Sequence, residues 1–168
     1  LTAVAVDGFR KLFAAMQGSL QETDPAERMR ALGRAYFGFA LENPAHYRVM
    51  FGTELLDHKA HSEEFLEVST RALTTLIDTV ADLTGDTSPG RSERLSAGAF
   101  FAWSTVHGAV MLHLDGTFPL EGHCLPGETF DEEAMRKHEE YGLTITQEKI
   151  EQTIELITRG LLTLRSKQ

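Results

Sequence analysis

Apolar side chains recur every three or four residues along most of the chain, and this spacing places them on one face of an α-helix. Across a predicted first helix, residues 1–20, the spacing joins Val6, Phe9, Phe13 and Met16. The same periodicity predicts further helices over residues 25–42, 44–51, 62–84, 91–114 and 147–165. No segment alternates cleanly between apolar and polar positions, which is the pattern of a half-buried strand. The predicted fold class is therefore all-α.

Residues that start or stop helices lie between these periodic segments. Asp24 is expected to be the N-cap of the second helix, with Pro25 in the first helical position and Glu27 reaching back to complete a capping box. Asn43 and Pro44 end that helix and start a short one, because proline disfavours a helical conformation in the residue before it. The second helix is thus predicted to be bounded on both sides.

A connection of unusual length joins the last two predicted long helices. It runs over residues 117–146, carries several prolines and glycines, and contains a charged segment, 131–141, that is predicted to form a short helix. Long connections in compact domains are usually either functional or flexible. The segment is expected to pack over a pocket mouth or across a partner subunit, and a solvated surface loop is the alternative. The apolar side chains that favour packing are Phe118, Leu120, Leu125 and Phe130.

Composition narrows the class of protein. The 168 residues carry 16 Lys and Arg against 25 Asp and Glu, and a net charge of −9 repels the phosphates of nucleic acid. The longest apolar stretch, Ala97–Leu114, is interrupted by polar residues and is not expected to span a membrane. The one cysteine, Cys124, excludes an internal disulfide and fits a reducing compartment. These features predict a cytoplasmic globular domain that does not bind nucleic acid by itself.

Two segments together resemble a known family. They are residues 40–51 (ALENPAHYRVMF) and residues 102–110 (AWSTVHGAV), separated by a long amphipathic helix. Their order resembles the C-terminal regulatory domain of TetR-type (tetracycline-repressor-like) transcriptional regulators, and is most similar to the subgroup with a Trp-x-x-x-His-Gly signature. The start of the chain, 3–9 (AVAVDGF), looks like the linker helix that follows the family's helix-turn-helix. The resemblance covers nearly the whole chain except residues 117–146.

The resemblance implies a sensor role in a bacterial regulator. Residues 1–168 would form one ligand-binding and dimerisation domain, and the helix-turn-helix that reads DNA would precede Leu1 and be absent here. A small lipophilic or aromatic effector would tilt the first helix and release the regulator, a repressor in this interpretation, from DNA. Such a tilt matters because two recognition helices must stay about 34–36 Å apart to enter successive major grooves. DNA is expected as a partner only through the missing domain.

The resemblance also implies a symmetric homodimer built as a four-helix bundle from the last two long helices. Apolar residues in the last helix repeat at heptad-like steps, and the 91–114 helix is rich in small side chains. A lone monomer would bury both faces poorly, although burial against the rest of the same chain is the alternative. The predicted interface residues are Ala102, Val106, Ala109, Val110, Ile150, Ile154, Ile157, Leu161 and Leu164.

A ligand pocket in the helical core is the third implication. Bulky aromatic side chains bury much area and leave irregular gaps, and small-molecule pockets are mostly apolar with a few polar groups. His107 is open to two interpretations, since it either contacts the ligand or forms hydrogen bonds within the core. The predicted ligand-binding residues are Phe9, Phe13, Tyr36, Phe37, Tyr47, Met50, Phe51, Phe100, Trp103, His107 and Met111.

Other kinds of protein fit the sequence less well. Seven histidines suggest metal binding, with His58, His61, His123 and Cys124 as possible ligands, but their spacing matches no zinc pattern. The long helices lack paired Glu-x-x-His motifs, and the chain lacks a Gly-x-Ser-x-Gly segment and a phosphate-binding loop. No enzyme activity, cofactor or metal is therefore predicted. The alternative functions are a helical protein-interaction module without a ligand and, less favoured, a metal-binding helical bundle.

Overall fold

The computed structural model describes residues 1–52, 63–115 and 132–165, with the side chains of all of these except 132–147. Every regular element within these ranges is helical, which confirms the predicted fold class. The elements are α1 (Thr2–Gln17), η1 (Gly18–Gln21), α2 (Pro25–Glu42), α3 (Pro44–Phe51), α5 (Glu63–Thr84), η3 (Arg91–Glu93), α6 (Ala97–Leu114) and α7 (Glu132–Arg165).

The N-cap signals of the sequence are largely confirmed. The Asp24 carboxylate accepts a hydrogen bond from the backbone N–H of Glu27 at 3.2 Å, and Pro25 occupies the first turn of α2. The Glu27 side chain pairs with Arg30 at 2.9 Å, so the carboxylate lies along the helix and the capping box is not completed as predicted. Asp24 therefore starts α2 with a single side-chain cap.

The start of α6 differs from the sequence prediction. A continuous helix was expected from Arg91, but the chain first makes a left-handed turn at Gly90 (φ 72°) and a short 3₁₀ segment. The Ser96 hydroxyl then accepts a hydrogen bond from the backbone N–H of Ala99 at 3.2 Å. This serine cap satisfies a free N–H of the first turn, and α6 consequently begins at Ala97.

The last helix begins earlier than the sequence indicates. The sequence predicts a separate short helix over 131–141 and a last helix from Thr146, whereas α7 is continuous from Glu132 to Arg165. Gly142 does not interrupt it, because a single glycine costs a helix only about 1 kcal/mol. The long connection is accordingly shorter than predicted. Its apolar residues, Phe118 to Phe130, lie outside the described residues.

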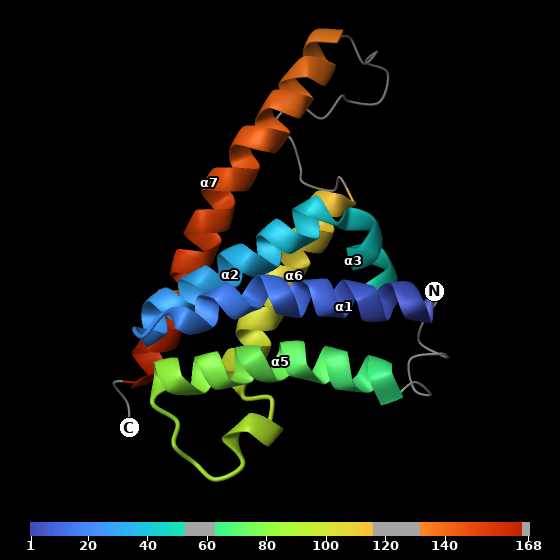
Figure 1. Ribbon diagram of the computed structural model, residues 1–168. Helices are drawn as coiled ribbons and strands as arrows, with labels where there is room; N and C mark the ends of the chain where they lie inside the picture. The colour runs from blue at the N-terminus through green and yellow to red at the C-terminus, as the bar shows by residue number, and fades with distance from the viewer. Residues whose placement is uncertain (53–62, 116–131, 166–168) are drawn as a thin grey trace.

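The helices form two groups that cross each other. Helices α1, α2 and α5 contact one another, and α3 packs against α1 and α2. Helices α6 and α7 contact each other and also pack against α2 and α5 (Figure 1). The first turns of α7 extend beyond the other helices (Figure 1). The buried core lies where the two groups meet.

The predicted dimer-interface residues are placed differently from the expectation. Most of them are buried against their own chain, with exposed fractions of 6% or less for Ala102, Val106, Val110, Ile154, Ile157 and Leu161. Ala109 and Ile150 are partly buried against the same core, and only Leu164 is exposed. The heptad-like seam of α7 faces α2 and α5 of the same chain. For this seam the structure favours burial within the chain, which was the alternative to a dimer interface.

Candidate functional site

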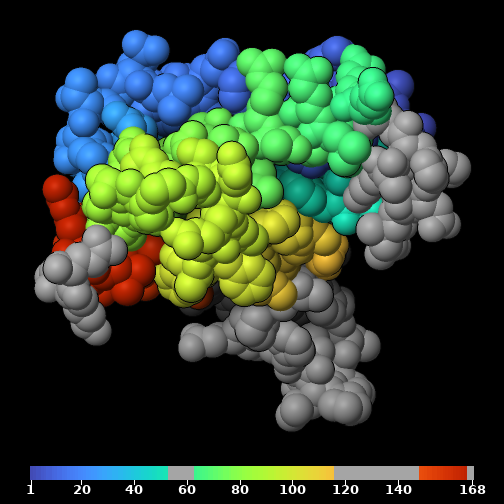
Figure 2. Space-filling view, turned by 90° about the horizontal axis from the view of Figure 1, so that it is seen from below, coloured from blue at the N-terminus to red at the C-terminus, as the bar shows by residue number. Residues whose placement is uncertain are grey.

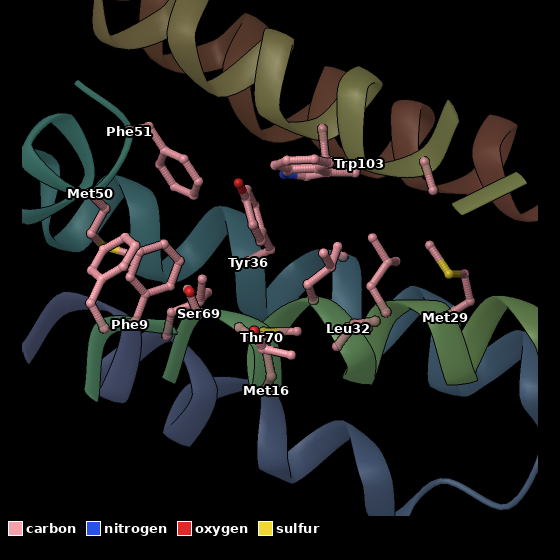
Figure 3. A pocket seen from close by; sticks show the side chains of 18 residues that line it. Phe9, Met16, Met29, Leu32, Tyr36, Met50, Phe51, Ser69, Thr70 and Trp103 are labelled. Atoms are coloured by element: carbon pink, nitrogen blue, oxygen red, sulfur yellow. The ribbon is translucent and has the colours of Figure 1, made fainter. Parts of the chain in front are cut away.

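A cavity of about 320 Å³ lies in the core between α1, α2, α3, α5 and α6. Figure 3 shows side chains converging on it from these helices, with Trp103 on one side, Ser69 and Thr70 on the other, and Tyr36 between them. Its volume is at the lower end of the range typical of small-molecule sites. The lining residues are Phe9, Leu12, Met16, Met29, Leu32, Gly33, Tyr36, Met50, Phe51, Phe65, Ser69, Thr70, Ala72, Leu73, Leu76, Ala102, Trp103 and Val106.

Aromatic rings bound one end of the cavity. The ring of Phe9 meets Phe51 and Phe65 edge-on, with centroid distances of 5.6 and 5.4 Å. Such T-shaped contacts are favourable and hold the rings at fixed angles. In each contact the edge of one ring faces the plane of the other, and the three rings line the same end of the cavity. Residues of α1, α3 and α5 thus build one wall of the cavity.

The described residues that line the cavity offer few polar groups and no charged side chain. The polar groups are the Tyr36 hydroxyl, the Trp103 indole N–H and the hydroxyls of Ser69 and Thr70. Ser69 already donates to the backbone carbonyl of Leu66 at 3.3 Å, which restricts it to accepting. The cavity is therefore suited to an apolar molecule with a small number of uncharged polar groups.

A cluster of three hydrogen-bonded side chains lies beside the cavity. The hydroxyls of Tyr36 and Tyr47 are 2.8 Å apart, and Nδ1 of His107 lies 2.6 Å from the Tyr47 hydroxyl and 3.3 Å from that of Tyr36. Tyr47 is completely buried. The cluster joins α2, α3 and α6, and Tyr36 is its member on the cavity surface.

Burial controls the protonation of this cluster. It raises the pKa of Tyr36 to about 12, although hydrogen bonds from Tyr47 and Trp103 oppose the shift. Burial also raises the pKa of Tyr47, and the neighbouring Tyr36 adds to the shift. The pKa of His107 is lowered by burial, so its imidazole is neutral at pH 7. All three groups are uncharged there, and none introduces a charge at the cavity edge.

The comparisons with known proteins agree with this helical arrangement. The profile of the family described as "Tetracyclin repressor-like, C-terminal domain" matches residues 29–136, which is more than half of the chain. The chain belongs to this family. Members of the TetR-like family regulate transcription and are not enzymes, so the predicted absence of enzyme activity agrees with the family assignment.

Relatives of this TetR-like domain carry matching descriptions. Curated proteins named HTH-type transcriptional regulators from Mycobacterium tuberculosis and Mycobacterium bovis are 23% identical over 158 residues. The match covers 78% of this chain and 68% of each relative. A solved structure of a protein of unknown function from Rhodococcus sp. RHA1 is similar with a TM-score of 0.56 and 25% identity. That structural match covers 85% of this chain and 71% of the other.

The structure brings five of the predicted ligand-binding residues to the cavity of the TetR-like domain. They are Phe9, Tyr36, Met50, Phe51 and Trp103. The neighbouring core holds Phe37, which is buried away from the cavity, together with the hydrogen-bonded Tyr47 and His107. His107 forms the core hydrogen bonds of one of its two predicted roles, and the other, contact with a ligand, stays a prediction.

Three predicted residues lie elsewhere. The ring centroid of Phe13 lies 4.5 Å from Cζ of the Arg71 guanidinium, and Phe13 is not a lining residue. Phe100 is 58% exposed, and Met111 is partly buried beside the core. The structure does not place these three residues in the described cavity lining, and their contact with a ligand stays a prediction.

Sequence reasoning missed the contribution of α5 to the cavity. Phe65, Ser69, Ala72 and Leu76 form one stripe of this helix, at steps of three and four, and all line the cavity. The periodicity that predicted the helix contained this signal. Two residues assigned to the dimer interface, Ala102 and Val106, also line the cavity.

The cavity lining is in direct contact with α1. A Cβ atom added to Gly8 would lie 2.4 Å from Sδ of Met50, so the two residues are packed without space between them. Beside this contact, Asp7 pairs with Lys11 at 2.7 Å and with His46 at 3.0 Å. Helix α3 is therefore joined to α1 by the close Gly8–Met50 packing and by the Asp7–His46 pair.

Metal and membrane chemistry find no support in the parts of the chain that the structure describes. Those residues contain no group of three or more His, Cys, Asp or Glu side chains placed to hold a metal ion. The histidines and the cysteine considered as ligands, His58, His61, His123 and Cys124, lie outside the described residues. Among the described residues, no helix is long and apolar enough to cross a bilayer.

Proposed function

We propose that this chain is the effector-binding and dimerisation domain of a bacterial, cytoplasmic TetR-type regulator, a repressor that releases DNA when a small lipophilic molecule occupies the cavity. The observation that carries the proposal is the cavity of about 320 Å³ with an apolar lining drawn from five helices. A filled core would favour a protein-interaction module without a ligand. The family assignment supports the regulatory role.

Coupling to DNA would run through α1, since three of its residues, Phe9, Leu12 and Met16, line the cavity. A ligand shifts a conformational equilibrium only when it binds one state better than the other. In the present state the Gly8–Met50 contact is tight, so a ligand that needs more room at this end favours a displaced α1. Displacement of α1 would change the spacing of two DNA-reading domains in a dimer.

The dimer would use the outward faces of α6 and α7 rather than the seam predicted from the sequence. Leu156 is 70% exposed on α7 and Phe101 is 48% exposed on α6. On the same faces, Gly108 and Gly160 have open space where a Cβ would lie. Large apolar residues beside glycines allow helices of a second copy to approach closely. A two-fold four-helix bundle would bury these groups.

Native mass spectrometry of the purified chain, with Ala72→Phe as the informative variant, tests the ligand proposal. Ala72 lines the cavity and is 6% exposed, so a phenylalanine there fills the space that a ligand would take. The wild type should carry added masses of a small molecule acquired from the host or from an added lipophilic extract, and the variant should not. Glu67→Phe, at an exposed position of the same helix, is the matched control and should behave as wild type. Equal binding by all three proteins would contradict a ligand site in this cavity.

Light scattering on a sizing column tests the dimer. Leu156→Arg should convert the dimer to a monomer, because it places an unpaired charge at the centre of an apolar interface. Leu20→Arg replaces another exposed leucine, in η1, and should leave the dimer intact. A dimer that persists in Leu156→Arg would show that α7 does not form the interface in this way.

A further inference from the structure

The cavity lining determines which chemical class of ligand it accepts, an inference that rests on the proposed sensor function. Among the 18 described residues that line it there is no Asp, Glu, Lys, Arg or His. A charged group transferred into an apolar site without a partner loses its hydration and gains nothing in return. An ionised carboxylate or ammonium group would therefore be strongly disfavoured at this site.

Two titratable groups of the described residues beside the cavity do not supply a counter-charge. His107 adjoins the cavity through Tyr36 and Tyr47, and burial keeps its pKa below the ordinary value, so it is neutral at pH 7. Arg71 is on α5, but its guanidinium stacks on Phe13 and is not among the lining groups. Neither group therefore places a charge in the described lining.

The hydrogen-bond cluster leaves one group free to recognise a ligand. Nδ1 of a neutral histidine is either one donor or one acceptor, and its 2.6 Å distance to the Tyr47 hydroxyl assigns it to that residue. The Tyr36 hydroxyl is bonded to Tyr47 at 2.8 Å. If Nδ1 accepts, Tyr36 donates to Tyr47, accepts from the Trp103 indole N–H and keeps one lone pair for the cavity. If Nδ1 donates, Tyr36 accepts from Tyr47 and keeps its O–H for the cavity.

A hydroxyl group on the ligand satisfies both arrangements, because it is a donor and an acceptor at once. The Trp103 indole N–H lies on the same side of the cavity and donates to the Tyr36 hydroxyl, which Figure 3 shows directed toward this indole. The remaining described wall is made of aliphatic side chains and aromatic rings, apart from the hydroxyls of Ser69 and Thr70, which lie across the cavity from Trp103 (Figure 3). The Tyr36 hydroxyl is therefore the recognition point on the Trp103 side of the cavity.

We propose that the cavity selects an uncharged amphiphile, an apolar chain or ring system with one hydroxyl-type group bound to Tyr36 beside Trp103, and that it rejects fatty-acid anions and lipophilic cations of the same size. Selection by charge follows from the neutral lining. Selection of the polar group follows from the hydrogen-bonding capacity that remains on Tyr36.

Three probes of equal chain length test the charge selection on the wild-type chain: 1-decanol, decanoate and decylammonium. Trp103 is the chain's single tryptophan and lines the cavity, so its fluorescence reports occupancy directly. At pH 7.5 and submicellar concentrations, decanol should bind at least about 100-fold more tightly than either ion, as expected for an unpaired buried charge. Decanoate or decylammonium binding as tightly as decanol would overturn the inference and leave the proposed sensor function intact.

Tyr36→Phe tests the recognition point, since it removes one oxygen and keeps the ring. Calorimetric titration should show decanol affinity lowered about fivefold, with the affinity for n-decane unchanged. Phe13→Leu is the control, because Phe13 is large, aromatic and outside the cavity lining, and it should change neither affinity. Equal loss of decanol and decane binding in Tyr36→Phe would show that the hydroxyl acts on packing alone. That result would overturn the proposed recognition of a ligand hydroxyl by Tyr36.

The outcomes separate the inference from the proposed function. Tight binding of a charged probe, displaced by Ala72→Phe, would keep the cavity as a sensor site and reject its charge selection. No change in Trp103 fluorescence with any of the three probes, together with no bound mass in native spectra, would reject both.

Discussion

Two parts of the same core differ in how they are filled. Around α7 the packing is solid, since Ile157 and Leu161 are each 1% exposed and a Cβ on Gly98 would meet Cδ2 of Leu161 at 3.0 Å. Between α1, α3 and α5 the core encloses a cavity of about 320 Å³. Helices α2 and α6 contribute to both parts. The difference therefore lies in the side chains that face them.

Side-chain shape explains the contrast. In the solid part, branched aliphatic residues of α7 lie opposite glycines, as Ile154 does at Gly33, where an added Cβ would be 2.9 Å from Cγ1. Flexible branched side chains fill the space that a glycine leaves. In the hollow part, the ring of Phe9 packs edge-to-face against the rings of Phe51 and Phe65, and rigid rings leave irregular gaps between them. A core with both kinds of contact combines stability with a binding site.

The largest expected effect compares two buried leucines. Leu161 (1% exposed) is in the solid part, and Leu12 (2% exposed) lines the cavity. Leu161→Ala should lower the free energy of unfolding by about 3–5 kcal/mol, whereas Leu12→Ala should cost about 1–2 kcal/mol less, because its side chain already lacks neighbours on one side. Urea unfolding at one protein concentration measures both. Equal losses would indicate that no cavity exists beside Leu12.

The next largest effect is expected when a small side chain is replaced by a larger one. Gly98→Val should destabilise the chain by about 1–3 kcal/mol, because its first added carbon already touches Leu161 and Val80. Ala72→Val adds volume toward the cavity and should change stability by less than about 0.5 kcal/mol. Thermal unfolding of the two variants provides the comparison. A larger loss in Ala72→Val than in Gly98→Val would contradict the assignment of the two parts.

Periodicity in the sequence predicted the helices, and of the two parts of the core it indicated the solid one around α7. Periodicity located each long helix and the inward stripes of α1, α2 and α7, because an apolar stripe must be buried somewhere. It did not show which partner buries the α7 seam, since a heptad-like stripe fits either the same chain or a second copy. For α6 it failed at Phe100, because apolar residues occur around the whole helix and no polar face marks the outside.

The cavity could not be predicted from periodicity for a different reason. The apolar periodicity of a helix marks inward positions. It does not distinguish a side chain that contacts another side chain from one that borders an empty space. Tyr36 and Phe37 are adjacent on α2, yet only Tyr36 lines the cavity. The lining residues of α5 were not predicted, since the cavity depends on ring contacts between helices far apart in the sequence.

A smaller effect is expected in the hydrogen-bond cluster beside the cavity. Tyr47→Phe keeps the buried ring and removes the hydroxyl that links Tyr36 to His107. Loss of this link should destabilise the chain by about 1–2 kcal/mol, because buried polar groups lose a partner. Urea unfolding measures it, with Thr163→Val on the exposed side of α7 as a control of little effect. No loss in Tyr47→Phe would mean that water replaces the hydroxyl at no cost.

The smallest effect is a dependence of stability on pH. Burial lowers the pKa of His107 below its ordinary value of 6.5, so below pH 6.5 the unfolded chain binds a proton that the folded chain does not. Stability should therefore fall as pH decreases through 6.5, and the fall should end once the pH is below the folded pKa. His107→Gln should show a shallower decline over this window in urea unfolding. Parallel curves for the two proteins would show that His107 titrates equally in both states.

The most direct test of the cavity as a binding site is a crystal structure of the chain soaked with 1-decanol. The account predicts continuous density for the alkyl chain among Phe9, Leu12 and Leu73, with its oxygen within hydrogen-bond distance of Tyr36. A cavity closed by rearranged side chains, with decanol absent or bound only at the surface, would contradict it.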